Sequence, residues 1–168
     1  MARFFTRCLP TAVLLLSALL AAGCTGAASS AERTGGETGS PGGQKVTIMA
    51  RPLSGVGTVL VDSQGYALYM FQPDDRRSVT CTGACAGTWP PVMVPAGGMV
   101  VAGPGVKDTL LGSAADPDGG RVVTYDGWPL YTYTGDVSPG DTTGQNIDLN
   151  GGNWWVIRPS GQPLIPQP

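Results

Sequence analysis

The segments YMFQPD at residues 69–74 and YTYTGD at residues 131–136 decide the fold class. Each is a short alternating run that ends in an aspartate, and alternation places the tyrosine and the aromatic residue two positions later on one face of a strand. The two segments start 62 residues apart, and Gly65 and Gly127 recur at the same spacing. Such repetition predicts two copies of one unit that bury a shared core.

The chain between residues 46 and 158 lacks helical periodicity, and Gly, Pro, Asp or Asn bound its short apolar runs. The runs predict strands at 46–49, 58–61, 67–71, 121–125, 130–133 and 154–157. Hairpin turns are expected at 62–65 and 125–127, a helical turn between Thr82 and Pro90, and a strand or a bare turn at 106–111. We predict an all-β domain of two related repeats with pseudo-two-fold symmetry, at about 57–96 and 119–158.

The N-terminus carries the features of an export signal. Arg3 and Arg7 precede an apolar run at residues 9–22, which is shorter than the roughly 20 residues that a membrane-spanning helix needs. The run ends in LAAGC, which resembles a bacterial lipobox with Cys24 as the lipidated residue. We predict a lipoprotein signal peptide at 1–23 and attachment to the extracytoplasmic face of a membrane. An ordinary signal peptide followed by a chance cysteine is the alternative.

Low-complexity sequence flanks the predicted domain on both sides. Residues 24–45 hold the lipidated cysteine and a Gly-, Ser- and Thr-rich linker, a composition typical of a flexible tether. Residues 159–168 hold several prolines and predict an extended or frayed tail. The domain proper is therefore expected at 46–158.

Charge and cysteine content narrow the function classes. Removal of the signal peptide leaves 8 basic and 12 acidic residues, too few cations for a nucleic-acid-binding face. Cys81 and Cys85 then remain as an even pair in an oxidising compartment, which predicts a disulfide, with two free thiols as the alternative. Their spacing has one residue more than a redox-active Cys-x-x-Cys pair, although a redox role remains open.

The repeated motif resembles a known family. Tyr69, Phe71 and Asp74, followed by Tyr131, Tyr133 and Asp136, are similar to the Yx(FWY)xxD motif of predicted bacterial lipoproteins, a family also described as a secreted repeat of unknown function. The CTGACA segment at 81–86 before Trp89 resembles the family's first repeat, and the segments at 141–145 and 151–155 resemble its second. The resemblance implies location and architecture but no activity.

The motif aspartates allow two interpretations. Asp74 and Asp136 can cap turns by accepting backbone N–H groups, while the aromatic residues of the motif pack the core. Alternatively, the oxygen-rich loop at 136–150 can supply a calcium site, for which Asp136, Asp141 and Asp148 are the candidate ligands. The spacing does not match an EF-hand, and we expect no resident cofactor.

Exposed aromatic residues are the candidate ligand contacts. Tyr66 and Trp128 lie beside turn glycines, and Trp154 and Trp155 must point to opposite faces of a strand. Tyr66, Trp128 and Trp154 can stack on a small-molecule ligand or a partner protein, or can simply cover the core. The chain has no histidine and no Gly-x-Ser-x-Gly motif, so we predict a non-enzymatic binding domain. The alternative is a redox or metal-handling lipoprotein that uses Cys81 and Cys85 or the 136–150 loop.

Overall fold

A computed structural model describes residues 43–76 and 78–167 of the chain. The predicted signal peptide, Cys24 and most of the predicted linker lie outside the described residues. Within the described ranges, no helix is long and apolar enough to cross a membrane. Gly43 and Gln44 already belong to the domain, because the Gln44 carbonyl accepts a hydrogen bond from the N–H of Met99 at 3.1 Å.

The all-β prediction is confirmed, with the strands arranged in three small sheets. The first sheet has the order β2-β1-β4, formed by β1 (Lys45–Leu53), β2 (Gly57–Val61) and β4 (Met99–Ala102). The second has the order β3-β9-β8, formed by β3 (Tyr69–Phe71), β8 (Ile147–Leu149) and β9 (Gly152–Val156). The third has the order β5-β6-β7, formed by β5 (Leu111–Ala115), β6 (Arg121–Tyr125) and β7 (Trp128–Pro129).

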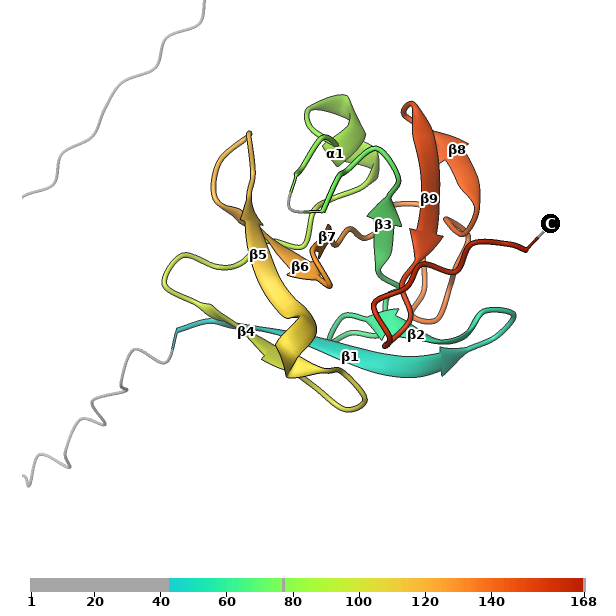
Figure 1. Ribbon diagram of the computed structural model, residues 1–168, viewed down its shortest axis with the longest axis horizontal. Coiled ribbons are helices and arrows are strands. Elements are labelled where there is room, and N and C mark those ends of the chain that lie inside the picture. Colours follow the sequence, from blue (N-terminus) through green and yellow to red (C-terminus); the bar gives the residue numbers. More distant parts are fainter. Residues whose placement is uncertain (1–42, 77, 168) are drawn as a thin grey trace, which may run out of the picture. The chain divides into compact units, whose positions relative to one another are not determined.

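Two short helical elements join the sheets, α1 (Ala84–Thr88) and the 3-10 turn η1 (Asp108–Leu110). The helical turn predicted between Thr82 and Pro90 corresponds to α1. Figure 1 shows β3 and β7 near the centre of the domain, with β8 and β9 on one side and β5 and β6 on the other. Within the segment 106–111, for which the sequence predicts a strand or a bare turn, Asp108–Leu110 form η1 and Leu111 begins β5.

Both predicted hairpin turns are present, and each has a local cause. The Asp62 carboxylate accepts hydrogen bonds from three successive backbone N–H groups, those of Gln64, Gly65 and Tyr66, at 2.8–2.9 Å. In the second turn, Asp126 (φ 50°) and Gly127 (φ 85°) both adopt the left-handed conformation that a tight two-residue hairpin needs. This second turn joins β6 to β7 and positions Asp126 at the surface.

The predicted strand at 130–133 is reduced to isolated bridges at Tyr131. Its partner segment contains Pro90 and Pro91, which have no N–H to donate, so a regular ladder cannot form there. The C-terminal tail, predicted as extended or frayed, is not frayed at residues 163–164. Pro163 forms a bridge with Ile157, and the N–H of Leu164 donates to the Val156 carbonyl at 2.9 Å, which adds this segment to the folded domain.

The predicted pseudo-two-fold symmetry is visible in matched backbone hydrogen bonds. In each copy the backbone N–H groups and carbonyls of three residues form a closed cycle of hydrogen bonds, with N···O distances of 2.7–3.3 Å. The cycle consists of Leu60, Leu68 and Ile157 in one copy and of Val123, Leu130 and Val92 in the other. Ile157 belongs to repeat 2 but completes the cycle of repeat 1, and Val92 of repeat 1 completes the cycle of repeat 2. The two repeats therefore exchange their last segments, which are β9 with Ile157 in repeat 2 and the bridge-forming residues 91–93 in repeat 1.

Because of this exchange, buried residues pack against both faces of β9. Trp154 and Trp155 point to opposite faces, as predicted, but both are buried, because the sheet is covered on its two faces. Trp155 packs in a cluster with Leu68, Tyr125 and Ile157, whereas Trp154 packs in a second cluster that contains the motif aromatics.

Candidate functional site

The motif tyrosines and aspartates pair across the two repeats. The Tyr69 hydroxyl donates to Asp136 Oδ2 at 2.6 Å, and the Tyr131 hydroxyl donates to Asp74 Oδ2 at 2.5 Å. The two tyrosines also exchange both backbone hydrogen bonds, at 2.9 and 3.0 Å. All four residues are buried. Because the bonds between the two tyrosines are reciprocal, the pseudo-two-fold relation passes through the Tyr69–Tyr131 pair.

The second oxygen of each aspartate closes a loop within its own repeat. Asp74 Oδ1 accepts hydrogen bonds from the N–H and the hydroxyl of Thr80 at 2.7 and 2.6 Å. Asp136 Oδ1 accepts the same two groups from Thr143 at 2.8 and 2.6 Å. The predicted turn-capping role is thus present. The tyrosine partner supplied by the other repeat is an additional contact that sequence reasoning missed.

Burial controls the ionisation of this cluster. Loss of solvation raises the pKa of Asp74 above its ordinary value, against the opposing effect of the hydrogen bonds from Thr80 and Tyr131. Burial, together with the neighbouring carboxylate, raises the pKa of Tyr69 and of Tyr131 far above the ordinary tyrosine value. Both phenols therefore remain protonated at neutral pH and act as hydrogen-bond donors.

Two motif aromatics and two buried tryptophans form one continuous stack in the core. The order is Phe71, Trp154, Trp89, Tyr133, with ring-centroid distances of 4.2, 3.9 and 4.1 Å between neighbours. Tyr69 meets Trp89 edge-on at 5.4 Å, and Tyr131 meets Trp154 in the same way at 5.2 Å. Trp154 is fully buried, so it is not available to stack on a ligand.

Cys81 and Cys85 lie at disulfide-bonding distance, with their Cα atoms 5.2 Å apart. The pair brackets the start of α1, and the Cys85 carbonyl accepts a hydrogen bond from the N–H of Trp89 at 2.8 Å. Cys81 is buried, with 2% of its surface exposed, and packs in the aromatic cluster. This placement favours a staple that holds Trp89 in the stack over a thiol pair that exchanges with partners.

The three candidate calcium ligands do not converge. Both oxygens of Asp136 are occupied by Tyr69 and Thr143, as described above. Asp141 accepts a hydrogen bond from the N–H of Ser138 at 2.9 Å, and Asp148 is exposed on β8 opposite Asn153. Across residues 43–76 and 78–167, no three acidic, cysteine or histidine side chains form a group that could hold a metal ion.

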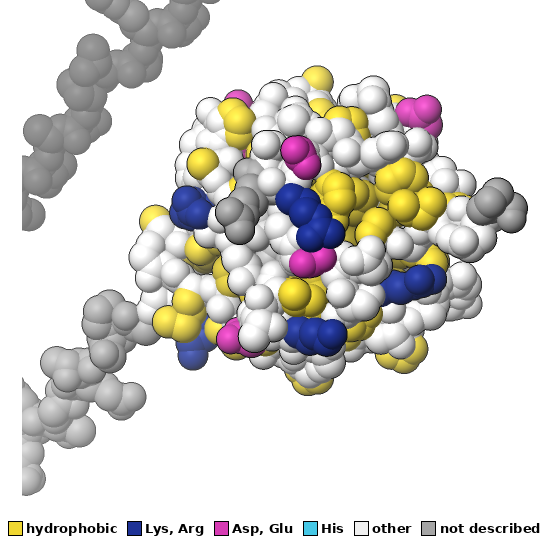
Figure 2. Space-filling view, viewed as in Figure 1, with side chains coloured by type: hydrophobic (Ala, Val, Ile, Leu, Met, Phe, Trp, Pro, Cys, Tyr) yellow, Lys and Arg dark blue, Asp and Glu magenta, His cyan; other side chains and the backbone are white. Residues whose placement is uncertain are grey.

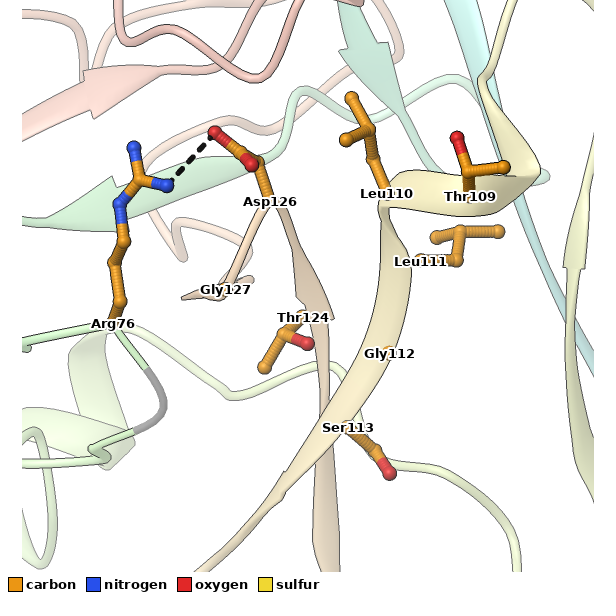
Figure 3. Close-up of a pocket in the computed structure, with 9 residues that line it drawn as sticks. All are labelled: Arg76, Thr109, Leu110, Leu111, Gly112, Ser113, Thr124, Asp126 and Gly127. Atoms are coloured by element: carbon orange, nitrogen blue, oxygen red, sulfur yellow. Dashed lines mark ion pairs between the residues drawn. The ribbon is translucent and has the colours of Figure 1, made fainter.

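A surface groove that the sequence did not indicate lies beside β5 and β6 (Figure 3). It has a volume of about 530 Å³ and is lined by Arg76, Thr109, Leu110, Leu111, Gly112, Ser113, Thr124, Asp126 and Gly127. Gly112 leaves its floor open, because a Cβ at this position would lie 2.9 Å from the Thr124 hydroxyl. The groove thus depends on the absence of a side chain at Gly112, opposite the Thr124 hydroxyl.

An ion pair closes one end of the groove. Arg76 Nη1 lies 3.2 Å from Asp126 Oδ2, and the guanidinium carbon lies 5.8 Å from the centre of the Trp128 ring. Gly161 packs so closely on Asp126 that a Cβ there would lie 2.6 Å from the Asp126 Cβ. Asp126 is therefore held by its turn and by this contact. Of the predicted ligand contacts, Trp128 is half-buried beneath Arg76, and Tyr66 is half-buried in the first turn.

These features define a class of protein, an all-β domain in which two sequence repeats exchange their last segments around one aromatic core. The chain belongs to the family described as a secreted repeat of unknown function, which matches residues 54–93 and 112–158. The two matched segments correspond to the two predicted repeats, and the match confirms the resemblance carried by the motif. No curated protein and no solved structure matches the chain.

Proposed function

We propose that the chain is a lipid-anchored, non-catalytic binding domain on the extracytoplasmic side of a bacterial membrane. Membership of a secreted family agrees with an extracytoplasmic location. The finer assignment rests on the basic n-region, the short apolar run and the LAAGC segment that ends at Cys24. A diacylated cysteine supplies the two acyl chains that stable membrane anchoring requires.

The observation that carries the binding role is the contrast between the motif and the groove. The motif tyrosines and aspartates satisfy one another in the core, where a ligand cannot reach them. The groove instead offers an accessible guanidinium and an accessible carboxylate, together with the exposed hydroxyl of Thr109. Concave sites that combine apolar walls with a few polar groups are the usual places of small-molecule recognition.

Lipid attachment is tested by metabolic labelling with an alkyne analogue of palmitate in a bacterial host that expresses the full chain. We expect label on the wild-type protein, recovery in the membrane fraction, and loss of both in Cys24→Ala. A wild-type chain that is exported without label would refute the anchor and leave the binding role to be tested separately.

The binding role is tested with the ¹⁵N-labelled Cys24→Ala chain, which retains every described residue. Addition of a soluble digest of bacterial envelope, containing glycans and peptides, should shift the amide resonances of Gly112, Thr124 and Gly127. Resonances of exposed residues on β8, such as Asp148, should stay in place. Absence of any saturable shift in the groove would overturn the proposal.

A further inference from the structure

We infer that the groove is a saccharide subsite, in which Arg76 and Asp126 hold neighbouring hydroxyl groups of a neutral sugar. The inference rests on the proposed binding function and names the class of its ligand.

The charge of the groove favours a neutral ligand. Arg76 and Asp126 are its two ionisable lining residues, and their opposite charges are paired at 3.2 Å. A charged ligand would be attracted by one member of this pair and repelled by the other. On the face in Figure 2, basic and acidic side chains are likewise interspersed rather than gathered into one patch.

The hydrogen-bonding groups fit a diol. A sugar hydroxyl both donates and accepts, so one hydroxyl can donate to a carboxylate while its neighbour accepts from a guanidinium. Both partners are reachable, since 51% of the Arg76 side chain and 25% of the Asp126 side chain are exposed. Two adjacent hydroxyls can therefore contact this ion pair at its solvent side without separating it.

The rest of the lining matches the body of a sugar ring. The exposed Thr109 adds a hydroxyl group to the lining. Figure 3 shows the buried Thr124 on the side of Gly112 and Ser113 farther along β5, where the Ser113 hydroxyl accepts a hydrogen bond from Arg121 Nε at 2.7 Å. Leu110 and Leu111 are half-buried and add apolar surface, which suits the C–H face of a pyranose. The volume of about 530 Å³ lies within the roughly 300–1,000 Å³ range of small-molecule sites.

Trp128 acts in this site as a positioning residue. Its ring lies beneath the Arg76 guanidinium, with 5.8 Å from the guanidinium carbon to the ring centre, a distance at which cation–π attraction operates. The ring therefore orients Arg76 and does not itself stack on the sugar. This differs from the stacking role that the sequence suggested for Trp128.

The pseudo-two-fold symmetry does not generate a second site. At the equivalent turn of repeat 1, a Cβ on Gly65 would lie 3.3 Å from the Pro139 Cβ, and the Gly65 carbonyl accepts a hydrogen bond from the N–H of Gly140 at 3.0 Å. The corresponding neighbour of Gly127 is the Arg76 side chain. The same Cβ on Gly65 would lie 3.6 Å from Arg51 Nη1, so an arginine is present at both turns. Gln64 stands in repeat 1 where repeat 2 has Asp126, so the carboxylate is specific to one copy and the inference requires one sugar per chain.

The test uses the ¹⁵N-labelled Cys24→Ala chain and separate titrations with maltotetraose, cellotetraose, mannotetraose and chitotetraose. At least one of these neutral oligosaccharides should shift Gly112, Thr124 and Gly127 with one-to-one stoichiometry at millimolar concentration. Asp126→Asn, which keeps the turn because asparagine tolerates a positive φ, should weaken this binding about tenfold, the effect of one lost strong hydrogen bond. Asp148→Asn makes the same chemical change on exposed β8 and should leave binding unchanged.

A second variant distinguishes loss of binding from loss of the fold. Gly112→Ala fills the floor without altering charge and should also weaken saccharide binding, while its amide spectrum away from the groove stays native. Groove shifts caused by peptides of the envelope digest but by none of the four oligosaccharides would overturn the saccharide inference and leave the proposed binding function in place. No groove shift with either class would overturn both. Equal affinities of Asp126→Asn and wild type would also overturn the inference.

Discussion

The Tyr69 hydroxyl donates a 2.6 Å hydrogen bond to Asp136, a residue of the other repeat. The same bond recurs in the opposite direction from Tyr131 to Asp74. Each repeat thus provides the tyrosine for the aspartate of its partner. In this chain the repeated motif therefore joins the two repeats and does not present exposed functional groups.

Loss of one motif hydroxyl should destabilise the whole domain. Tyr69→Phe leaves Asp136 buried without a donor on Oδ2, and hydrogen bonds to charged groups contribute about 1.5–3 kcal/mol. We expect urea unfolding to show a loss of this size for Tyr69→Phe and for Tyr131→Phe. Tyr133→Phe is the matched control, since its hydroxyl makes no hydrogen bond within the described part of the chain. An equal loss in all three variants would contradict the assigned role.

The buried phenols should make the domain sensitive to alkali. Tyr69 and Tyr131 have folded-state pKa values raised above the ordinary 10.0, so the unfolded chain releases these protons first. Their stabilising contribution is complete below pH 10 and falls above it, by about 1.4 kcal/mol per pH unit for each tyrosine. The free energy of unfolding, measured from pH 8 to 12, should show this decline. A Tyr69→Phe/Tyr131→Phe variant should lack most of it, and an unchanged slope in that variant would refute the assignment.

Reduction of the disulfide should have a modest effect. The Cys81–Cys85 loop is short, and chain entropy predicts a contribution of about 2 kcal/mol. We expect the reduced protein to retain its β-sheet circular dichroism and to unfold at lower urea concentration, with Trp89 fluorescence changed because α1 loosens. Complete unfolding on reduction would show that the staple carries more of the stability than this loop entropy provides.

Two glycines give a direct test of the aromatic stack. A Cβ on Gly144 would lie 2.8 Å from the Trp89 ring and 3.0 Å from Tyr69, so Gly144→Ala should cost about 1–3 kcal/mol through overpacking. Gly87 lies in α1 with nothing within 4 Å of its added Cβ, so Gly87→Ala should stabilise by about 0.5–1 kcal/mol. Thermal denaturation of both variants measures the contrast. A stabilised Gly144→Ala protein would show that the stack has room.

Local signals in the sequence were sufficient for the fold class. The repeat spacing gives two copies, and Asp126-Gly127 specifies its hairpin because both residues accept positive φ. Hydrogen bonds between residues far apart in the sequence could not be predicted from such local signals. Tyr69 and Asp136 are 67 residues apart, and nothing local in either copy indicates that the tyrosine serves the other repeat.

The groove was missed for a different reason. It depends on Gly112 facing Thr124 across β5 and β6, and the LGSAA sequence of β5 has little of the β-branched or aromatic content that marks a strand. Trp128 was identified as a candidate, but its position beneath Arg76 depends on a loop of the other repeat. A contact of this kind follows from tertiary packing and has no signature in sequence spacing.

The exchange of last segments between the two repeats has a consequence for assembly. A chain with a single repeat would expose the edge that Ile157 or Val92 covers, and would find its complement only in a second identical chain. Its folding would then depend on concentration, as for an obligate homodimer. Covalent linkage of the two units replaces that bimolecular encounter by an intramolecular one at high effective concentration. The fused chain can therefore fold as a monomer at any dilution.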